Sequence, residues 1–98
     1  MANVDRYQAS ERALLTELGD GTGVLLDLDS KFYFTLNETA LFVWKQLTDG
    51  QAREREQLAS ALAGAFEVDV GSANADLDSV LELLTRERLV TRATPAAP

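Results

Sequence analysis

The chain has 98 residues, a formal net charge of −7, and neither cysteine nor histidine. A chain of this length forms a single domain with a modest core. Without cysteine or histidine it has no disulfide, no zinc site that relies on these residues, and no Cys-His or Ser-His-Asp nucleophile. Carboxylates leave an all-oxygen calcium or magnesium site formally open, but no segment has the spacing of an EF-hand. We therefore expect no catalytic residues, no metal and no cofactor, and we predict that the chain is not an enzyme.

Charge and hydropathy also restrict the partners and the location. Nine basic against sixteen acidic residues disfavour nucleic acid and anionic membrane surfaces, because phosphate binding relies on Lys and Arg. No stretch resembles a signal peptide, and no run approaches the roughly 18 apolar residues that span a bilayer. The expected location is therefore the cytoplasm. We expect a flexible N-terminus over residues 1–10, a folded domain over residues 11–91 and a disordered Pro/Ala tail over residues 92–98.

Three apolar segments in the first half of the chain predict three strands. The first covers residues 13–18 and ends at a glycine-rich turn. The second covers residues 24–28, and the third covers residues 31–36, which are rich in aromatic and β-branched types. The short turn between the last two strands predicts an antiparallel hairpin.

The alternation of side chains predicts which face of each strand is buried. In the second strand, the predicted core residues are Val24, Leu26 and Leu28. In the third strand, one face carries Phe32, Phe34 and Leu36, and the other carries Lys31, Tyr33 and Thr35.

After residue 36 the apolar spacing changes to that of helices. Asn37 can cap a first helix, because its side chain accepts from free N–H groups, and Asp49-Gly50 is expected to end that helix. Two more helices follow, separated by a break over residues 68–71, and residues 89–91 predict a short extended end. The three apolar stripes are Ala40, Val43, Trp44 and Leu47; Leu58, Ala61, Leu62, Ala65 and Phe66; and Ala73, Leu77, Val80, Leu81 and Leu84.

Strands grouped before helices predict an α+β fold. A three-stranded antiparallel sheet followed by three helices is typical of a winged helix-turn-helix-like domain. In this order the third strand lies at a sheet edge, unless the extended end covers it. With one Lys, no Pro and no Gly, this edge is weakly protected, and it suits the addition of an extended peptide as a further strand. The alternative is that its apolar side chains are simply core.

The third helix carries a second row of side chains beside its core stripe: Asp76, Val80, Leu83 and Glu87. A helix with such a widened apolar face either packs on two sides or lines a groove. Packing is the more common explanation, and both remain open at this point.

Taken together, these segments resemble the PqqD family, also called RiPP precursor-peptide recognition elements. The resemblance spans about residues 13–90, and its segments are specific in combination rather than singly. Where family members often have a glycine before the third-strand aromatics, this sequence has Ser30-Lys31. The matching residues are Val24-Leu25-Leu26-Asp27, residues 32–36, Leu36-Asn37-Glu38-Thr39-Ala40, Val43-Trp44, Asp49-Gly50, Leu58, Leu62, Phe66, Ala75-Asp76-Leu77, Val80-Leu81, Leu84 and Leu89-Val90.

The resemblance implies a stand-alone domain that binds the leader of a ribosomally made precursor peptide. In the family, the leader adds as a strand to the third strand and lies between it and the third helix. Its partner is then a separate enzyme: a radical-SAM enzyme in pyrroloquinoline quinone systems, or a leader peptidase in lasso-peptide systems. The implied peptide-binding residues are Lys31, Phe32, Tyr33, Phe34, Thr35, Asp76, Val80, Leu83, Leu84 and Glu87.

Two other functions remain open beside that of a non-catalytic adaptor, which holds the precursor near its enzyme. A winged-helix transcriptional regulator that binds DNA has the same topology. The third helix, however, is acidic over most of its length, with Arg86 and Arg88 only near its end. The chain can also form a homodimer through its edge strand.

Overall fold

The computed structural model describes residues 6–48 and 53–93. Its strands form two separate antiparallel sheets, in the orders β2-β3-β4 and β5-β1-β6. The predicted α+β class, with a three-stranded antiparallel sheet followed by three helices, is confirmed, and the second sheet is an addition. In chain order the elements are β1 (Arg6–Ala9), β2 (Ala13–Glu17), β3 (Gly23–Asp27), β4 (Tyr33–Leu36), α1 (Glu38–Gln46), β5 (Arg53–Glu54), α2 (Arg55–Phe66), α3 (Val70–Arg86) and β6 (Val90–Ala93).

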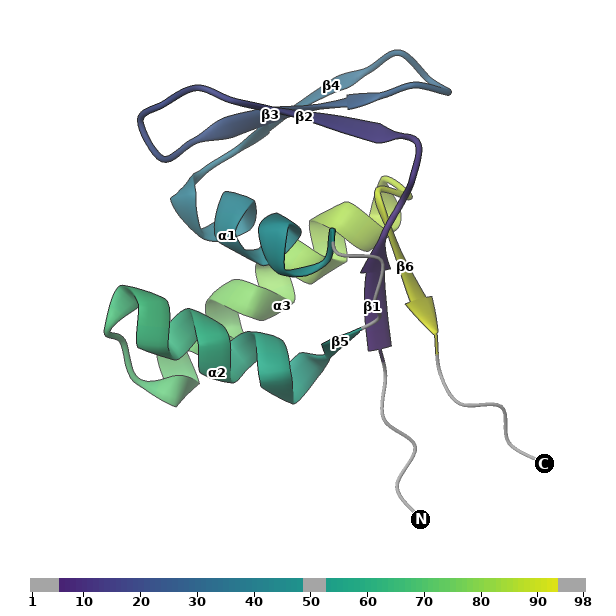
Figure 1. Cartoon of the computed structure of the whole chain (residues 1–98). Coiled ribbons are helices and arrows are strands. Elements are labelled where there is room, and N and C mark those ends of the chain that lie inside the picture. Colours follow the sequence, from purple (N-terminus) through teal and green to yellow (C-terminus); the bar gives the residue numbers. More distant parts are fainter. Residues whose placement is uncertain (1–5, 49–52, 94–98) are drawn as a thin grey trace, which may run out of the picture.

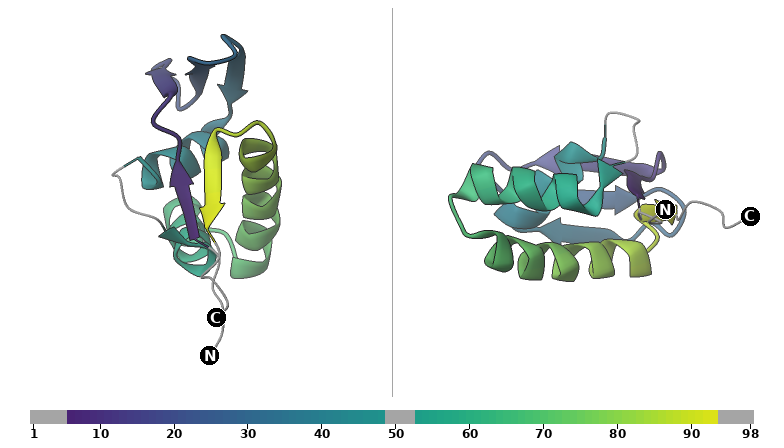
Figure 2. Two further views of the ribbon diagram at one scale, coloured as in Figure 1. Left: turned by 90° about the vertical axis from the view of Figure 1, so that its right-hand side faces the viewer. Right: turned by 90° about the horizontal axis from the view of Figure 1, so that it is seen from below.

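The two sheets lie on different sides of the helices. The β2-β3-β4 sheet lies across the top of α1 and the C-terminal part of α3, whereas β1 and β6 run down beside the helices (Figure 1). The two ends of the described chain lie side by side in the smaller sheet, because Arg6 pairs with Ala93 (Figure 2). One face of the β2-β3-β4 sheet therefore covers the helices, and the other face is turned away from them.

The smaller sheet extends the folded domain beyond the predicted limits. Residues 1–10 are predicted to be flexible, but Arg6–Ala9 form β1, which pairs with β5 and β6. The pairing partner lies at the far end of the sequence, so local patterning does not indicate it, and Tyr7 is the one large apolar anchor, 7% exposed. At the other end, β6 continues to Ala93, which is past the predicted limit at residue 91. Residues 1–5 and 94–98 lie outside the described part of the chain.

The core face of β3 is the opposite of the predicted one. Leu25 is fully buried, whereas Val24, Leu26 and Leu28 are half-buried. The register explains this, because Leu25 pairs with Leu15 on one side and Phe34 on the other, and this row faces the helices. A run of consecutive apolar residues fits either face, so the spacing alone does not decide between them.

The helices begin where capping side chains are available. Asn37 caps α1 as predicted, its Oδ1 accepting from the Ala40 N–H at 2.8 Å, which is worth about 1 kcal/mol. Asp69 caps α3 by accepting from the Ser72 N–H at 2.7 Å, so this helix begins within the predicted break. Trp44 on α1 is 2% exposed and belongs to the core, as the stripe predicts. The predicted end of the first helix, Asp49-Gly50, lies outside the described residues.

The turn before β4 carries a residue in a left-handed conformation. Lys31 has a φ of 66°, a region that glycine adopts without penalty and that costs other residues about 1–2 kcal/mol. Hydrogen bonds hold the turn, since the Lys31 N–H donates to the Asp27 carbonyl at 2.8 Å and the Asp27 N–H donates to the Phe32 carbonyl at 3.0 Å. Lys31 therefore adopts in this turn the left-handed conformation that glycine often provides in the family.

Candidate functional site

The free edge of β4 is the first component of the site. Strand β4 ends the order β2-β3-β4, and β6 pairs with β1 instead of covering it. Because the Asp27 N–H donates to the Phe32 carbonyl, the alternation of an antiparallel ladder directs the backbone of Phe34 and Leu36 toward β3. The N–H and C=O groups of Tyr33 and Thr35 consequently point away from the sheet. No strand in the described part of the chain pairs with them.

An apolar cavity of about 470 Å³ lies between β4, the start of α1 and the middle of α3. Leu36 and Leu84, 1% and 0% exposed, belong to its floor. Leu83 is half-buried and Thr35 is exposed, which places them at its rim. The full lining is Thr22, Thr35, Leu36, Asn37, Ala40, Ser79, Val80, Leu83 and Leu84.

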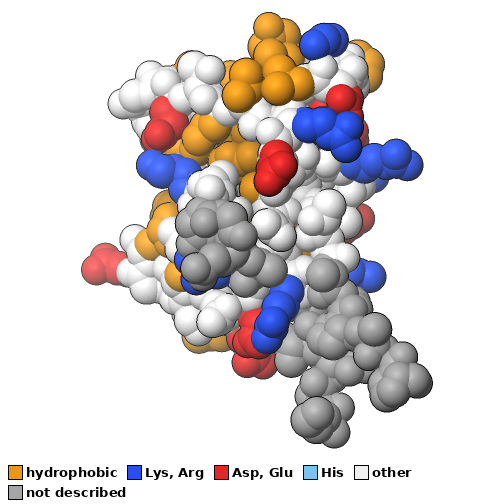
Figure 3. Space-filling model, turned by 45° about the vertical axis from the view of Figure 1, so that its right-hand side comes forward, with side chains coloured by type: hydrophobic (Ala, Val, Ile, Leu, Met, Phe, Trp, Pro, Cys, Tyr) orange, Lys and Arg blue, Asp and Glu red, His pale blue; other side chains and the backbone are white. Residues whose placement is uncertain are grey.

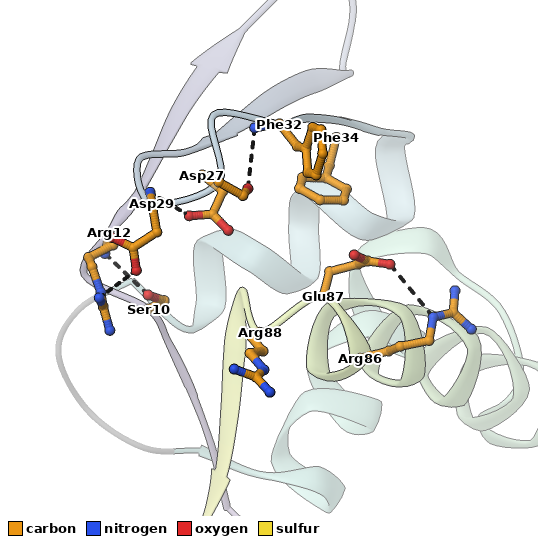
Figure 4. Close-up of a pocket in the computed structure, with 10 residues that line it drawn as sticks. Ser10, Arg12, Asp27, Asp29, Phe32, Phe34, Arg86, Glu87 and Arg88 are labelled. Carbon is orange, nitrogen blue, oxygen red and sulfur yellow. Dashed lines mark hydrogen bonds and ion pairs between the residues drawn. The ribbon is translucent and has the colours of Figure 1, made fainter.

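A second cavity, of about 420 Å³, lies between the start of β4 and the C-terminal end of α3. Phe32 and Phe34 line one side, and charged side chains surround them (Figure 4). Glu87 forms an ion pair with Arg86 at 3.7 Å, and Arg12 pairs with Asp29 on the opposite side. The other lining residues are Ser10, Asp27, Ser30 and Arg88.

The charge of Asp27 is fixed by the turn that precedes β4. Its carboxylate accepts from the Asp29 N–H at 2.9 Å, and this bond, helped by Ser30 and Arg12, holds the pKa of Asp27 below its ordinary value. Asp27 is therefore ionised at neutral pH. The charged cavity thus offers aromatic faces together with charges of both signs.

The structure brings most of the predicted site residues together. We call the two cavities, with the β4 edge above them, the β4–α3 groove. Thr35, Val80, Leu83 and Leu84 line its apolar cavity, and Phe32, Phe34 and Glu87 line its charged cavity. The two elements that the sequence indicates, the third strand and the third helix, therefore share one groove.

Three predicted residues lie outside the two cavities. Lys31 is exposed in the turn, and Tyr33 is 71% exposed on the face of the sheet turned away from the helices. Asp76 is exposed on α3 and lines neither cavity. The position of Asp76 follows from the lengths of the two elements. A four-residue strand extends about 13 Å, whereas α3 rises about 16 Å between positions 76 and 87, so β4 does not reach along this whole stretch of the helix.

Sequence reasoning also missed part of the groove. Ser79 lies one helical turn before Leu83, so the spacing of the second row on α3 could have indicated it. No such signal marks the other lining residues, which include Thr22 and Asp29 in turns, Asp27 at the end of β3, and the basic residues Arg12 and Arg88. Their place at the groove depends on how the turns fold against the end of α3.

The structure also bears on metal binding and on membrane crossing. Over residues 6–48 and 53–93, no three His, Cys, Asp or Glu side chains are grouped so as to hold a metal ion. Within the same residues, no helix has the length and apolarity needed to cross a membrane. What the groove does offer is backbone hydrogen-bonding groups, apolar surface and charges of both signs.

The fold and the groove together define a winged-helix-like domain in which the β4 edge of a small sheet lies beside a helix and is paired with no strand of the described residues. The family model described as "Coenzyme PQQ synthesis protein D (PqqD)" matches residues 22–90, and the chain belongs to this family. No curated protein matches the chain.

Two solved structures have a similar fold. One is TbiB1 in complex with the TbiA(β) leader peptide, with a TM-score of 0.73 and 24% identity, covering 93% of this chain and 99% of that one. The other is the PqqD truncation of Methylobacterium extorquens PqqCD, described as a functional and stand-alone RiPP recognition element. Its TM-score is 0.69 at 21% identity, with 88% of each chain covered. At these identities the likeness shows the fold alone.

Proposed function

We propose that this chain is a non-catalytic adaptor that captures the leader of a ribosomally synthesised precursor peptide by strand addition. The observation that carries the proposal is the edge of β4, where the Tyr33 and Thr35 backbone groups lie beside an apolar cavity and pair with no strand in residues 6–48 and 53–93. Membership of the PqqD family supports it, and so does the leader peptide named in the TbiB1 complex. The adaptor then presents the leader to a separate modifying enzyme or leader peptidase.

Strand addition explains how so small a surface holds a peptide. Tyr33 and Thr35 offer two N–H and two C=O groups, and each hydrogen bond contributes about 0.5–1.5 kcal/mol net. Hydrogen bonds to the leader backbone do not depend on the side chains of the leader. The cavities below the edge therefore supply the specificity for the leader sequence. Ordering an extended leader costs free energy, which the apolar contacts offset.

The two cavities select different leader side chains. Side chains of an added strand that point toward α3 recur at every second position. The apolar cavity beneath Thr35 accepts an aliphatic or aromatic side chain against Leu83 and Leu84. The charged cavity beneath Phe34 accepts a side chain with an apolar stem and a polar or charged tip, which can meet Glu87 or Arg88. We therefore infer a leader with an apolar anchor and an amphipathic side chain.

The biosynthetic pathway depends on the class of the partner enzyme, and we propose two classes. A leader peptidase places the chain in a lasso-peptide pathway, and a radical-SAM enzyme places it in a pathway like that of pyrroloquinoline quinone. In either option the adaptor acts by raising the local concentration of precursor at the enzyme. A homodimer paired through β4 occupies the same edge, so leader and self-association are expected to compete.

Isothermal titration with the synthetic leader of the precursor encoded beside this chain tests the proposal. A 1:1 complex with the leader, and none with a scrambled peptide of the same composition, is the expected result. Absence of binding by a well-folded chain would refute it. Retention of DNA that falls steeply with salt would instead support a transcriptional regulator.

A further inference from the structure

A further cavity, of about 280 Å³, lies at the end of the molecule where the β2–β3 turn, the start of α1 and the end of α2 meet (Figure 1). None of its described lining residues lines either cavity of the β4–α3 groove. Pockets for small molecules generally reach at least about 300 Å³, so this cavity is sized for a side chain rather than a cofactor. We call it the Phe42–Phe66 pocket, and its lining is Glu17, Gly21, Glu38, Leu41, Phe42, Lys45 and Phe66.

Two half-buried phenyl rings form the apolar wall of the Phe42–Phe66 pocket. The rings meet edge to face, with their centroids 5.6 Å apart and an angle of 86° between their planes. Leu41, 6% exposed, forms part of the floor. Both rings pack at the margin of the core and also line the cavity, so a ligand can touch them. The face of a phenyl ring carries partial negative charge and therefore attracts a cation.

A carboxylate with no partner among the described residues lies beside these rings. Glu17 pairs with Lys45 at 3.1 Å, whereas the Glu38 side chain makes no hydrogen bond or ion pair within residues 6–48 and 53–93. Glu38 is held against the β2–β3 turn, since a Cβ atom at Gly21 would lie 3.0 Å from the Glu38 Cγ. The macrodipole of α1 favours a carboxylate in this first turn, but it leaves the charge unneutralised. A lysine or arginine side chain fits such a site.

The two ends of the β2-β3-β4 sheet differ in their basic residues. Lys and Arg side chains gather at the end with the charged cavity, which Arg12, Arg86 and Arg88 line (Figure 3). In the Phe42–Phe66 pocket, Lys45 is the only basic residue in the described lining, and its ion pair with Glu17 occupies it. A basic side chain of a ligand therefore meets fewer competing cations in this pocket than in the charged cavity.

The Phe42–Phe66 pocket adjoins the proposed leader site. Residues 21–22, 37–38 and 40–41 each contribute one member to the pocket and the other to the apolar cavity of the groove. A leader strand that continues past the end of β4 at Leu36 leaves the groove over the first turn of α1. A helix with its side chains is about 10–12 Å wide, which three or four extended residues cover. The leader can therefore reach the pocket soon after it leaves the groove.

We propose that the Phe42–Phe66 pocket binds a lysine or arginine side chain of the leader, about three to five residues beyond the leader residue that occupies the apolar cavity. The inference rests on the proposed function and deepens it by adding a cationic anchor outside the groove. The charged group pairs with Glu38, and the aliphatic stem lies against the two phenyl rings. Two anchors at a fixed spacing also set the register of the added strand, which main-chain hydrogen bonds alone leave open.

Replacing Glu38 by glutamine tests this pairing. Glu38→Gln keeps the size of an exposed side chain and removes its charge. Glu56→Gln is the matched control, because Glu56 is also exposed in the first turn of a helix and is absent from the described lining of all these cavities. The ligands are the synthetic leader of the precursor encoded beside this chain and versions of it in which each Lys or Arg is replaced by glutamine. Isothermal titration measures the affinity of each combination.

The proposal expects Glu38→Gln to weaken binding of the unchanged leader at least threefold, and Glu56→Gln to leave it unchanged. It also expects one basic leader residue whose replacement weakens binding to the wild-type chain but has no further effect in Glu38→Gln, as coupled partners require. Equal losses in the two variants, or a leader with no basic residue coupled to Glu38, would overturn it.

Two other outcomes separate this inference from its neighbours. If Glu38→Gln weakens binding of the purified partner enzyme and leaves leader affinity unchanged, the inference is overturned in favour of a protein partner at this pocket. If the wild-type chain does not bind the unchanged leader at all, the proposed function is refuted, and this inference falls with it.

Discussion

Replacing Thr35 by proline tests whether the leader pairs with the β4 edge. The Thr35 N–H points away from β3, so a proline there removes no ladder hydrogen bond, and an edge strand tolerates it. When position 35 is proline, a leader paired with β4 loses the hydrogen bond that the Thr35 N–H would donate. The leader carbonyl that would accept this bond is left unpaired. These two losses amount to about 0.5–1.5 and about 1–3 kcal/mol. A combined loss of about 2 kcal/mol corresponds to roughly 30-fold weaker binding.

The opposite edge of the same sheet supplies the matched control. The Leu28 N–H donates to the Arg12 carbonyl at 2.9 Å, so the alternation directs the Ala13 N–H toward the free edge of β2. Ala13→Pro therefore makes the same change without touching the leader site. Titration calorimetry and thermal unfolding of both variants should show similar small losses of stability, with weakened leader binding only in Thr35→Pro. Equal leader affinity in the two variants would refute pairing at β4.

Three further predictions concern the groove and its turn. Leu83→Glu places a charge at the half-buried rim of the apolar cavity, and we expect at least tenfold weaker leader binding by titration with little change in melting temperature. Lys31→Gly removes a left-handed penalty of about 1–2 kcal/mol and adds about 0.5–1 kcal/mol of backbone entropy cost, so urea unfolding should show a gain of about 0.5–1 kcal/mol. The hydrogen bond from the Asp29 N–H lowers the pKa of Asp27. The Asp27 carboxylate therefore stabilises the turn fully at pH values above the ordinary aspartate pKa, and this stabilisation is lost as the pH falls through the lowered pKa. The amide shift of Asp29 should report this titration, and Asp27→Asn should abolish it.

Short-range patterning predicts most of the helices and strands but not the second sheet. The helical stripes place Trp44 and Leu84 in the core, and Asn37 caps α1 as its residue type indicates. Strand β1 has no such signal, because it is polar and its ladder partner β6 lies at the other end of the sequence. The orientation of β3 is also undetermined by sequence, since its apolar run lets either Leu25 or Leu26 face the helices.

The site follows the same division between local and long-range information. Val80, Leu83 and Leu84 are predictable from helical spacing, because residues on one helix face stay together however the helix packs. How much of α3 lies under β4 depends on where the strand crosses it, which excludes Asp76 and includes Ser79. Tyr33 has the opposite orientation to Phe34, so its backbone contributes to the edge while its side chain lies on the face of the sheet turned away from the helices.

The most direct measurement of leader capture is an amide chemical-shift titration of the whole chain with the leader peptide. The account predicts the largest shifts at the edge of β4, with smaller shifts along α3 from Ser79 to Glu87 and little change in β1 and β6. It also predicts that the Tyr33 and Thr35 amides become protected from hydrogen exchange when leader is bound. Shifts confined to the smaller sheet, or exchange at Tyr33 and Thr35 that stays as fast as in the free chain, would contradict it.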